Sequence, residues 1–291
     1  MKNTSKINLS RQNDPRLAEV LNAVDKCCTE LGIDFYILGA LARDVWYREG
    51  EIPILGTKDV DFAILIRDVE QFSQLKEMLE KSFGFTPITD NEFALIAENR
   101  LQIDILPFGQ LEVEDGQAFD VSKHKVKVNG LNEVYLQSVK PVFLFDDREF
   151  NVATLPAIFL LKLIAYDDRP EQRPNDPEDC MSIVQNYFEL QQDLIYDDHA
   201  DLFGENPLEQ IAARVIGREL RGTLNQENDD QLRERAIQIL QGHIQLKEKS
   251  QFVLRMAASL YYGTDEAVMY LEEILAGIME PLTPEKADEN A

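Results

Sequence analysis

The sequence has little of what an exported or membrane-bound protein needs. Its 3 cysteines, Cys27, Cys28 and Cys180, are an odd set without paired spacing, which argues against a disulfide framework. The longest apolar run, residues 155–161, is broken by Lys162 and is too short to span a membrane. The first residues are polar, so we expect no signal peptide. Together these absences predict a cytoplasmic protein that does not bind membranes.

Basic residues are also scarce. The chain has 29 Lys and Arg against 53 Asp and Glu, so its formal net charge is −24. A surface this negative repels polyphosphate backbones, which argues against broad nucleic-acid binding. It suits a cationic small molecule or a basic protein partner. With 291 residues, 44% of them hydrophobic, the chain can still form one large globular domain or two ordinary ones.

Hydrophobic periodicity changes along the chain. Helical stretches alternate with short strand-like runs, 134–136 among them, up to about residue 150. Helical periodicity dominates beyond that point, with one helix expected over 180–195. The predicted fold class is therefore α+β. A mixed sheet flanked by helices in residues 1–150 precedes a helical domain in 151–280, and a polar tail in 281–291 is expected to be disordered.

Three acidic residues interrupt two apolar, β-branched runs. Asp59 and Asp61 are two residues apart, so on a strand they point to the same side. Asp104 stands alone in a second such run, where an unpaired acid is costly. If the two strands are neighbours, three carboxylates converge on one point. Oxygen ligands of this kind suit Mg²⁺, which predicts a site for metal-dependent phosphoryl or nucleotidyl transfer.

A glycine stands between a predicted strand, residues 34–38, and a predicted helix, residues 40–48. The first N–H groups of a helix are free to bind an anion, and Gly39 would let a phosphate approach the backbone closely. Followed by the Asp-x-Asp strand, this junction predicts a phosphate site beside the carboxylates.

A further cluster lies in the helical part. Lys162 interrupts an apolar helix face, so its ammonium must reach water or find an anion, and a triphosphate is a suitable one. Asp176 and Asp179 are three residues apart at the start of the next helix, where N-capping explains one of them.

Together these motifs resemble a known superfamily. The pair Gly39-Ala40, the run Thr57-Lys58-Asp59-Val60-Asp61 and Asp104 resemble the motifs of DNA polymerase β-type nucleotidyltransferases. The pattern Lys162…Asp168-Arg169…Asp176-x-x-Asp179 is similar to that of the AbiEii-type members, the toxin enzymes of bacterial abortive-infection and toxin–antitoxin systems. The resemblance covers roughly residues 34–195.

The resemblance implies a polymerase β-like fold, a nucleoside triphosphate, two Mg²⁺ ions and transfer of a nucleoside monophosphate. The acceptor would be RNA, a protein or a cationic small molecule, and a basic antitoxin would be a partner. Metal binding and catalysis are assigned to three residues: Asp59, Asp61 and Asp104. Nucleotide binding is assigned to a second set: Gly39, Ala40, Arg43, Thr57, Lys162, Asp176 and Asp179.

Two alternatives stay open on the same fold. One is an enzyme that modifies aminoglycosides or adds nucleotides to the tRNA terminus; the acidity of the chain suits a cationic aminoglycoside. The other is a catalytically silent protein that binds nucleotide or antitoxin. Two departures from the pattern favour it: Ala40 replaces a second Gly or Ser, and Asn175 stands where a basic residue usually precedes the acidic motif.

Overall fold

The computed structural model divides into two compact units, Met1–Leu161 and Lys162–Ala291. The division falls within helix α5, Leu155–Asp168. The domain limits predicted from the sequence remain predictions, because compactness alone does not show which part folds by itself. The structure describes residues 5–6, 15–52, 59–109, 112–113, 117–118, 126–127, 130–144, 148–204, 206–225, 230–258 and 263–281.

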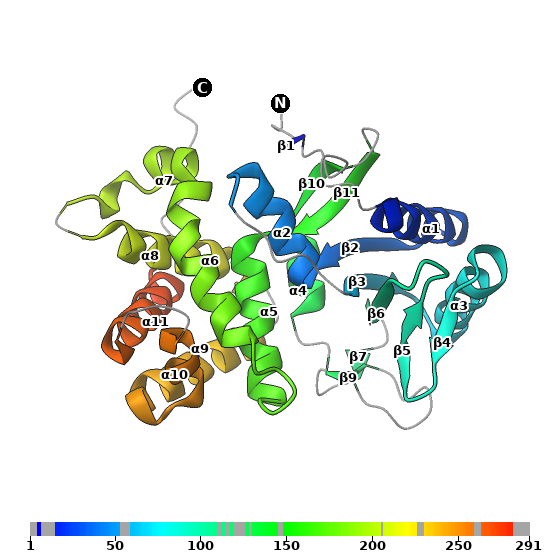
Figure 1. The fold of residues 1–291 in the computed structure, drawn as a ribbon. Helices are drawn as coiled ribbons and strands as arrows, with labels where there is room; N and C mark the ends of the chain where they lie inside the picture. Colours follow the sequence, from blue (N-terminus) through cyan, green and yellow to red (C-terminus); the bar gives the residue numbers. More distant parts are fainter. Residues whose placement is uncertain are drawn as a thin grey trace. The chain divides into compact units, whose positions relative to one another are not determined.

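The first unit is built on a mixed sheet with the strand order β1-β10-β11-β2-β3-β6-β5-β4 (Figure 1). Its central strands are β2, β3 and β6, of which β2 and β3 are antiparallel and β3 and β6 parallel. The strands of this sheet are β1 Ser5–Lys6, β2 Asp34–Leu38, β3 Asp59–Ile66, β4 Thr86–Ile88, β5 Asn91–Ile96, β6 Gln102–Gly109, β10 Val139–Leu144 and β11 Arg148–Ala153. A small antiparallel sheet holds β7 Glu112–Val113, β8 Gln117–Ala118 and β9 Val126–Lys127.

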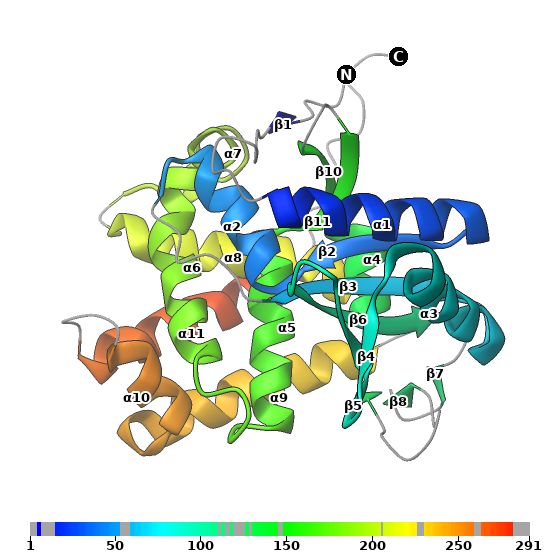
Figure 2. The ribbon, with the colours of Figure 1, turned by 45° about the vertical axis from the view of Figure 1, so that its right-hand side comes forward.

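Two long helices, α1 (Pro15–Leu31) and α3 (Val69–Phe83), lie side by side along the large sheet (Figures 1 and 2). Proline suits the first turn of α1, and Gly32 follows its end at a φ of 62°. The α3 helix is capped by Asp68, whose carboxylate accepts the backbone N–H of Gln71 at 2.8 Å. These local signals fix the end of α1 and the start of α3.

The two faces of the sheet are covered differently. On one face, Phe72 of α3 packs against Phe93 of β5, with ring centroids 6.0 Å apart. The other face receives α4, Leu131–Gln137, where the hydroxyl of Tyr36 donates to the carbonyl of Leu131 at 3.0 Å. Strand alternation gives this second face Tyr36 as well as Asp59 and Asp61. We call it the acid face.

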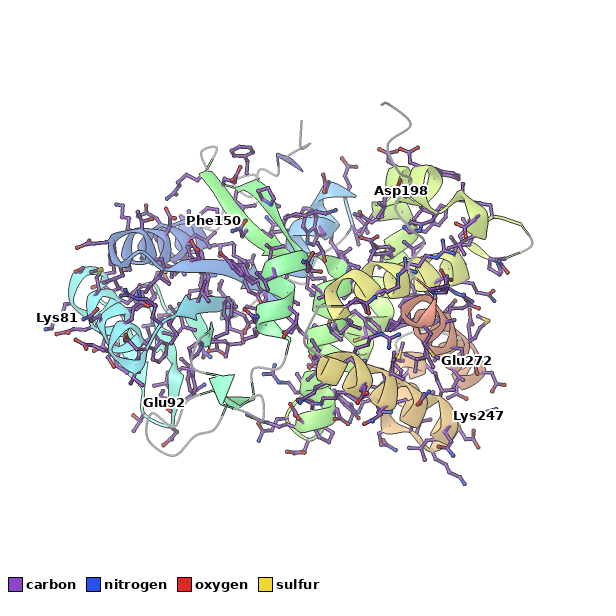
Figure 3. The ribbon with its side chains drawn as sticks, turned by 180° about the vertical axis from the view of Figure 1, so that it is seen from behind. Lys81, Glu92, Phe150, Asp198, Lys247 and Glu272 are labelled. Atoms are coloured by element: carbon purple, nitrogen blue, oxygen red, sulfur yellow. The ribbon has the colours of Figure 1, made fainter. Side chains whose placement is uncertain are left out.

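The second unit is helical. Its helices carry charged side chains outward, as do those of the first unit; Lys81, Asp198 and Glu272 are examples (Figure 3). Its elements, with the shared α5, are α6 Asp176–Leu190, α7 Gln192–Asp198, α8 Leu208–Leu224, α9 Asp230–Leu246, α10 Gln251–Ala258, α11 Thr264–Met279 and the short 3-10 turns η2 Ala200–Leu202 and η3 Lys247–Lys249.

The α8 and α11 helices cross closely because two glycines meet there. A Cβ on Gly217 would overlap the carbonyl oxygen of Ile274, and one on Gly277 would overlap the carbonyl oxygen of Arg214. Only glycine leaves room for the two backbones at this crossing.

The structure confirms the α+β class, with a mixed sheet and helices followed by a helical part. Two local expectations were wrong. Residues 134–136 lie in α4 rather than in a strand, because Gly130 begins a helix at a φ of 94° and Leu131 and Val134, one turn apart, are both buried. The single helix expected over 180–195 ends at Leu190, and α7 follows it after Gln191.

Other sequence expectations concern the membrane, the cysteines and the tail. No described helix is long and apolar enough to cross a membrane. Cys27, Cys28 and Cys180 are buried, as expected of core thiols, and burial raises the pKa of the Cys27 thiol to about 11. The tail predicted to be disordered lies outside the described residues, apart from Pro281.

Candidate active site on the acid face

Three carboxylates share the acid face. Asp59 and Asp61 alternate with the fully buried Val60 along β3, and each is half-buried. In the parallel pairing of β3 with β6, the Cα partner of Asp61 is Asp104, which is also half-buried. Paired residues of neighbouring strands point to the same side, about 4.8 Å apart. The structure therefore brings the three predicted acids onto one face, with Asp61 and Asp104 side by side.

The turn at Gly39, between β2 and α2, lies next to Asp61. Leu38, the last residue of β2, is the Cα partner of Asp61, and Gly39 follows it at a φ of 67°. A Cβ on Gly39 would overlap the carboxylate oxygen Oδ2 of Asp61. Gly39 also begins α2, Gly39–Glu49, and Leu38, its N-cap, makes no side-chain hydrogen bond to the helix. The start of α2, with the half-buried Ala40, therefore lies against the acid face.

Sequence reasoning missed one polar residue of this face. Gln102 is the Cα partner of Asp59, and its side-chain amide donates from Nε2 to Oδ1 of Asp104 at 2.9 Å. Asp59, Asp61, Gln102 and Asp104 thus form a two-by-two array on β3 and β6. No local signal marks Gln102, because only the pairing of the strands reveals its neighbours.

Arg43 and Thr57 were also predicted to bind the nucleotide. The guanidinium of Arg43 on α2 is buried, contacts Asp44 through Nη2 at 3.0 Å and lies 5.6 Å from the ring centroid of Tyr47. Its charge is therefore balanced by a neighbouring residue. Thr57 lies outside the described residues.

In the second unit, Lys162 is held between the two acids of α6. Its Nζ lies 2.8 Å from Oδ1 of Asp176 and 2.6 Å from Oδ2 of Asp179. Burial lowers the pKa of Lys162, but the charges of the two carboxylates outweigh it and raise that pKa above its ordinary value. Oδ2 of Asp176 is buried without a hydrogen-bond partner. The ammonium that was expected to hold a triphosphate is thus already matched by two carboxylates.

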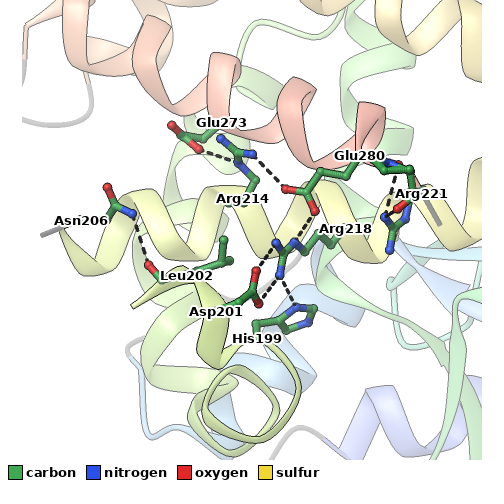
Figure 4. Close-up of polar contacts among 10 residues, drawn as sticks. His199, Asp201, Leu202, Asn206, Arg214, Arg218, Arg221, Glu273 and Glu280 are labelled. Carbon is green, nitrogen blue, oxygen red and sulfur yellow. Dashed lines mark hydrogen bonds and ion pairs between the residues drawn. The ribbon is translucent and has the colours of Figure 1, made fainter. Parts of the chain in front are cut away.

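A second set of ion pairs gathers at the end of α11 (Figure 4). Glu280 accepts from Arg214 at 2.9 Å and from Arg218 at 2.7 Å, and Arg218 also pairs with Asp201. Arg221 donates to the backbone carbonyl of Pro281 at 2.7 Å. The arginines follow one another at helical spacing on α8, so the cluster ties α8 to the end of α11.

Among the described residues, the acid face has the oxygen donors of a magnesium site but not their convergence. Within the described ranges, no three Asp, Glu, His or Cys side chains stand close enough to form a metal site. The donors are nevertheless of the right kind, because carboxylate oxygens are what Mg²⁺ prefers. The missing Cβ of Gly39 leaves room for the carboxylate of Asp61, whose Oδ2 fills that space. The residues fit the ion in kind, and the side chains of Asp59, Asp61 and Asp104 would turn toward one another to share it.

Comparisons with known proteins find only distant likenesses. No protein-family model matches the chain, and no curated protein matches it significantly. The fold is similar to that of the antibiotic-resistance factor ANT(2'')-Ia, with 13% identity, a TM-score of 0.37 and coverage of 65% of this chain and 96% of that one. It is also similar to an antigenic nucleotidyltransferase-like protein from Paracoccidioides brasiliensis, with 16% identity, a TM-score of 0.38 and coverage of 64% and 88%.

A CCA-adding enzyme in complex with CTP shows 11% identity and a TM-score of 0.32, with coverage of 91% of this chain and 80% of that one. Likenesses this remote assign no function. A functional assignment therefore has to come from the residues of α2, β3 and β6.

Proposed function

We propose that the acid face is the active site of a magnesium-dependent nucleotidyltransferase. The observation that carries the proposal is the position of Asp61. Asp61 is the Cα partner of Asp104 in the strand register, and its carboxylate lies against Gly39 at the start of α2. Carboxylates that share one face of neighbouring strands offer oxygen ligands of the kind that Mg²⁺ prefers.

The chain's own residues would divide the work. The first N–H groups of α2, at Gly39 and Ala40, would bind the phosphates of a nucleoside triphosphate. Asp59 and Asp61 would hold the metal that the nucleotide carries. Asp104 would complete a second metal position and accept the proton of the attacking hydroxyl. Bound Mg²⁺ would neutralise phosphate charge and lower the pKa of that hydroxyl.

The acceptor and the biological role form a finer proposal. The formal charge of −24 favours a cationic acceptor, such as an aminoglycoside, over RNA. The resemblance of the motifs to AbiEii-type enzymes supports a cytoplasmic bacterial toxin with a basic antitoxin as partner. For Lys162, Asp176 and Asp179 the nucleotide role stays a prediction, since their charges are matched among themselves.

Nucleotide binding tests the proposal directly. Calorimetry of the full chain with each of the four ribonucleoside triphosphates should show binding that requires Mg²⁺. Asp59→Ala and Asp61→Asn should abolish it, because each removes a metal ligand. The matched control is Asp90→Asn, which changes an exposed turn residue of the same unit. Unchanged affinity in both acid-face variants would remove the proposal.

Transfer is tested separately from binding. Radiolabelled triphosphates are incubated with the chain and Mg²⁺ in the presence of aminoglycosides, RNA or protein. Label on one of these acceptors identifies the acceptor class, and Asp104→Asn should stop the labelling while nucleotide still binds. Binding without label on any acceptor would instead support the silent nucleotide-binding protein.

A further inference from the structure

Gln102 is the one uncharged side chain in the array that it forms with Asp59, Asp61 and Asp104. In the strand register it stands beside Asp59, and along β6 it is two residues from Asp104, so it faces the same side as both. Its Nε2 donates to Oδ1 of Asp104 at 2.9 Å. It is the one amide among three carboxylates in this array.

An amide at this position has two effects that follow from its chemistry. Its N–H group holds one oxygen of a carboxylate, and carboxylates that bind a metal are oriented by such outer hydrogen bonds. It also adds no charge, so the array has three carboxylates rather than four. A glutamate of nearly the same shape would add a carboxylate that repels its neighbours until a cation is present.

We propose that Gln102 is a positioning residue for the metal site: its amide N–H holds Oδ1 of Asp104 and so orients that carboxylate, and its neutral side chain limits the number of carboxylates at the site. This inference rests on the proposed function of the acid face. It assigns Gln102 no contact with the nucleotide or with the reacting atoms.

Binding of Mn²⁺ alone tests this role without any need for the acceptor. Mn²⁺ has the same preference for oxygen ligands as Mg²⁺ and is followed by electron paramagnetic resonance of the full chain. Gln102→Leu removes the donor and should weaken Mn²⁺ binding about 10-fold or more, as loss of an outer hydrogen bond to a metal ligand does. Gln102→Glu should strengthen binding, because it adds a fourth carboxylate.

The control is Gln74→Leu, which makes the same change on the exposed surface of α3 and should leave Mn²⁺ binding unchanged. Circular dichroism melting shows that each variant is folded. A merely structural glutamine predicts that the Leu and Glu variants lose affinity alike, and that result would overturn the inference. So would wild-type affinity in Gln102→Leu.

Different results would contradict the proposed function and the role of Gln102. If the wild-type chain binds no Mn²⁺, with or without a nucleoside triphosphate, the proposed function falls and the role of Gln102 falls with it. If the wild-type chain binds Mn²⁺ and the two Gln102 variants do not separate in opposite directions, only the role of Gln102 is lost.

Discussion

Acidic residues have different neighbours in the two units of the chain. In the helical unit, acids and bases alternate: Lys162 lies between two carboxylates, and Glu280 accepts from two arginines. In the sheet unit, the register puts Asp61 beside Asp104 and an amide beside Asp59. Matched charges tie the helices of the second unit together, whereas the acid face gathers acidic residues side by side on two strands.

The comparison leads to a test that separates the two arrangements. Removing a charge from a matched cluster should lower the free energy of unfolding, whereas a change on the acid face should show its effect in the binding of Mg²⁺ and nucleotide.

Lys162→Met should cause the largest loss of stability. It leaves Asp176 and Asp179 without their cation, and Asp176 is buried. Breaking a buried ion pair on one side lowers the free energy of unfolding by about 3–5 kcal/mol. Thermal melting followed by circular dichroism measures the loss. The matched control is Lys81→Met, whose exposed ammonium pairs with Glu77 one turn away and should leave the melting temperature nearly unchanged.

Equal melting temperatures for the two lysine variants would contradict a structural role of the Lys162 cluster. That outcome would return Lys162 to the nucleotide role that the motif resemblance implies. A nucleotide-dependent rise in the melting temperature of the wild type that is lost in Lys162→Met would support the same conclusion.

Gly217→Ala should come next. The added Cβ would overlap the carbonyl oxygen of Ile274 and push α8 away from α11. Overpacking of this kind lowers the free energy of unfolding by about 1–3 kcal/mol. Gly222 lies on the same helix with nothing within 4 Å of the added atom. Gly222→Ala should therefore stabilise the helix by about 0.5–1 kcal/mol, and chemical denaturation of both variants measures the opposite signs.

Two glycines of the sheet unit distinguish an effect of backbone strain on stability from an effect on binding at the site. Gly39 and Gly32 both have positive φ, 67° and 62°, so alanine at either position should lower the free energy of unfolding by about 1–2 kcal/mol. Only at Gly39 would the new Cβ also overlap Asp61. Gly39→Ala should therefore lose Mn²⁺ and nucleotide binding, while Gly32→Ala keeps both. Equal binding of Mn²⁺ and nucleotide by the two variants would show that Gly39 is not part of the site.

Local patterns were enough to predict much of the fold. The change near residue 150 from alternating helical and strand-like runs to helical periodicity predicted the α+β class, which the structure confirms. Residues 134–136 were misread because the positive φ of Gly130 cannot be seen in a short apolar segment. Short runs are ambiguous between strand and helix, and tertiary packing decides between them.

The site could be predicted only in part, for a related reason. Asp59 and Asp61 share a face through local alternation, which the sequence shows. That Asp104 and Gln102 join them depends on the pairing of β3 with β6, about forty residues apart along the chain. The partners of Lys162 depend in the same way on how α5 and α6 pack, so the sequence indicated an ammonium in need of an anion but not which anion it meets.

The smallest expected effect concerns His243, a histidine of the helical unit with one buried ring nitrogen that has no hydrogen-bond partner. The ring of His243 stacks on Phe252 at 4.6 Å, its Nδ1 meets the hydroxyl of Ser250 at 2.9 Å, and its Nε2 is buried without a hydrogen-bond partner. Burial lowers the pKa of His243, and the charge of Asp167 offsets this only in part. A second proton on this ring is therefore more costly in the folded state than in the unfolded state.

This shift gives a definite sign to the pH dependence. The stability that the neutral ring contributes is present above the unfolded pKa of about 6.5 and is lost as the pH falls through that value toward the lower folded pKa. His243→Gln cannot titrate, so its melting temperature should fall less than that of the wild type between pH 7.5 and pH 5.5. Carboxylate titration is common to both proteins and cancels in the comparison. Parallel melting curves across this range would show that His243 is protonated as easily in the folded chain as in the unfolded one, and that the helical unit tolerates an unmatched charge after all.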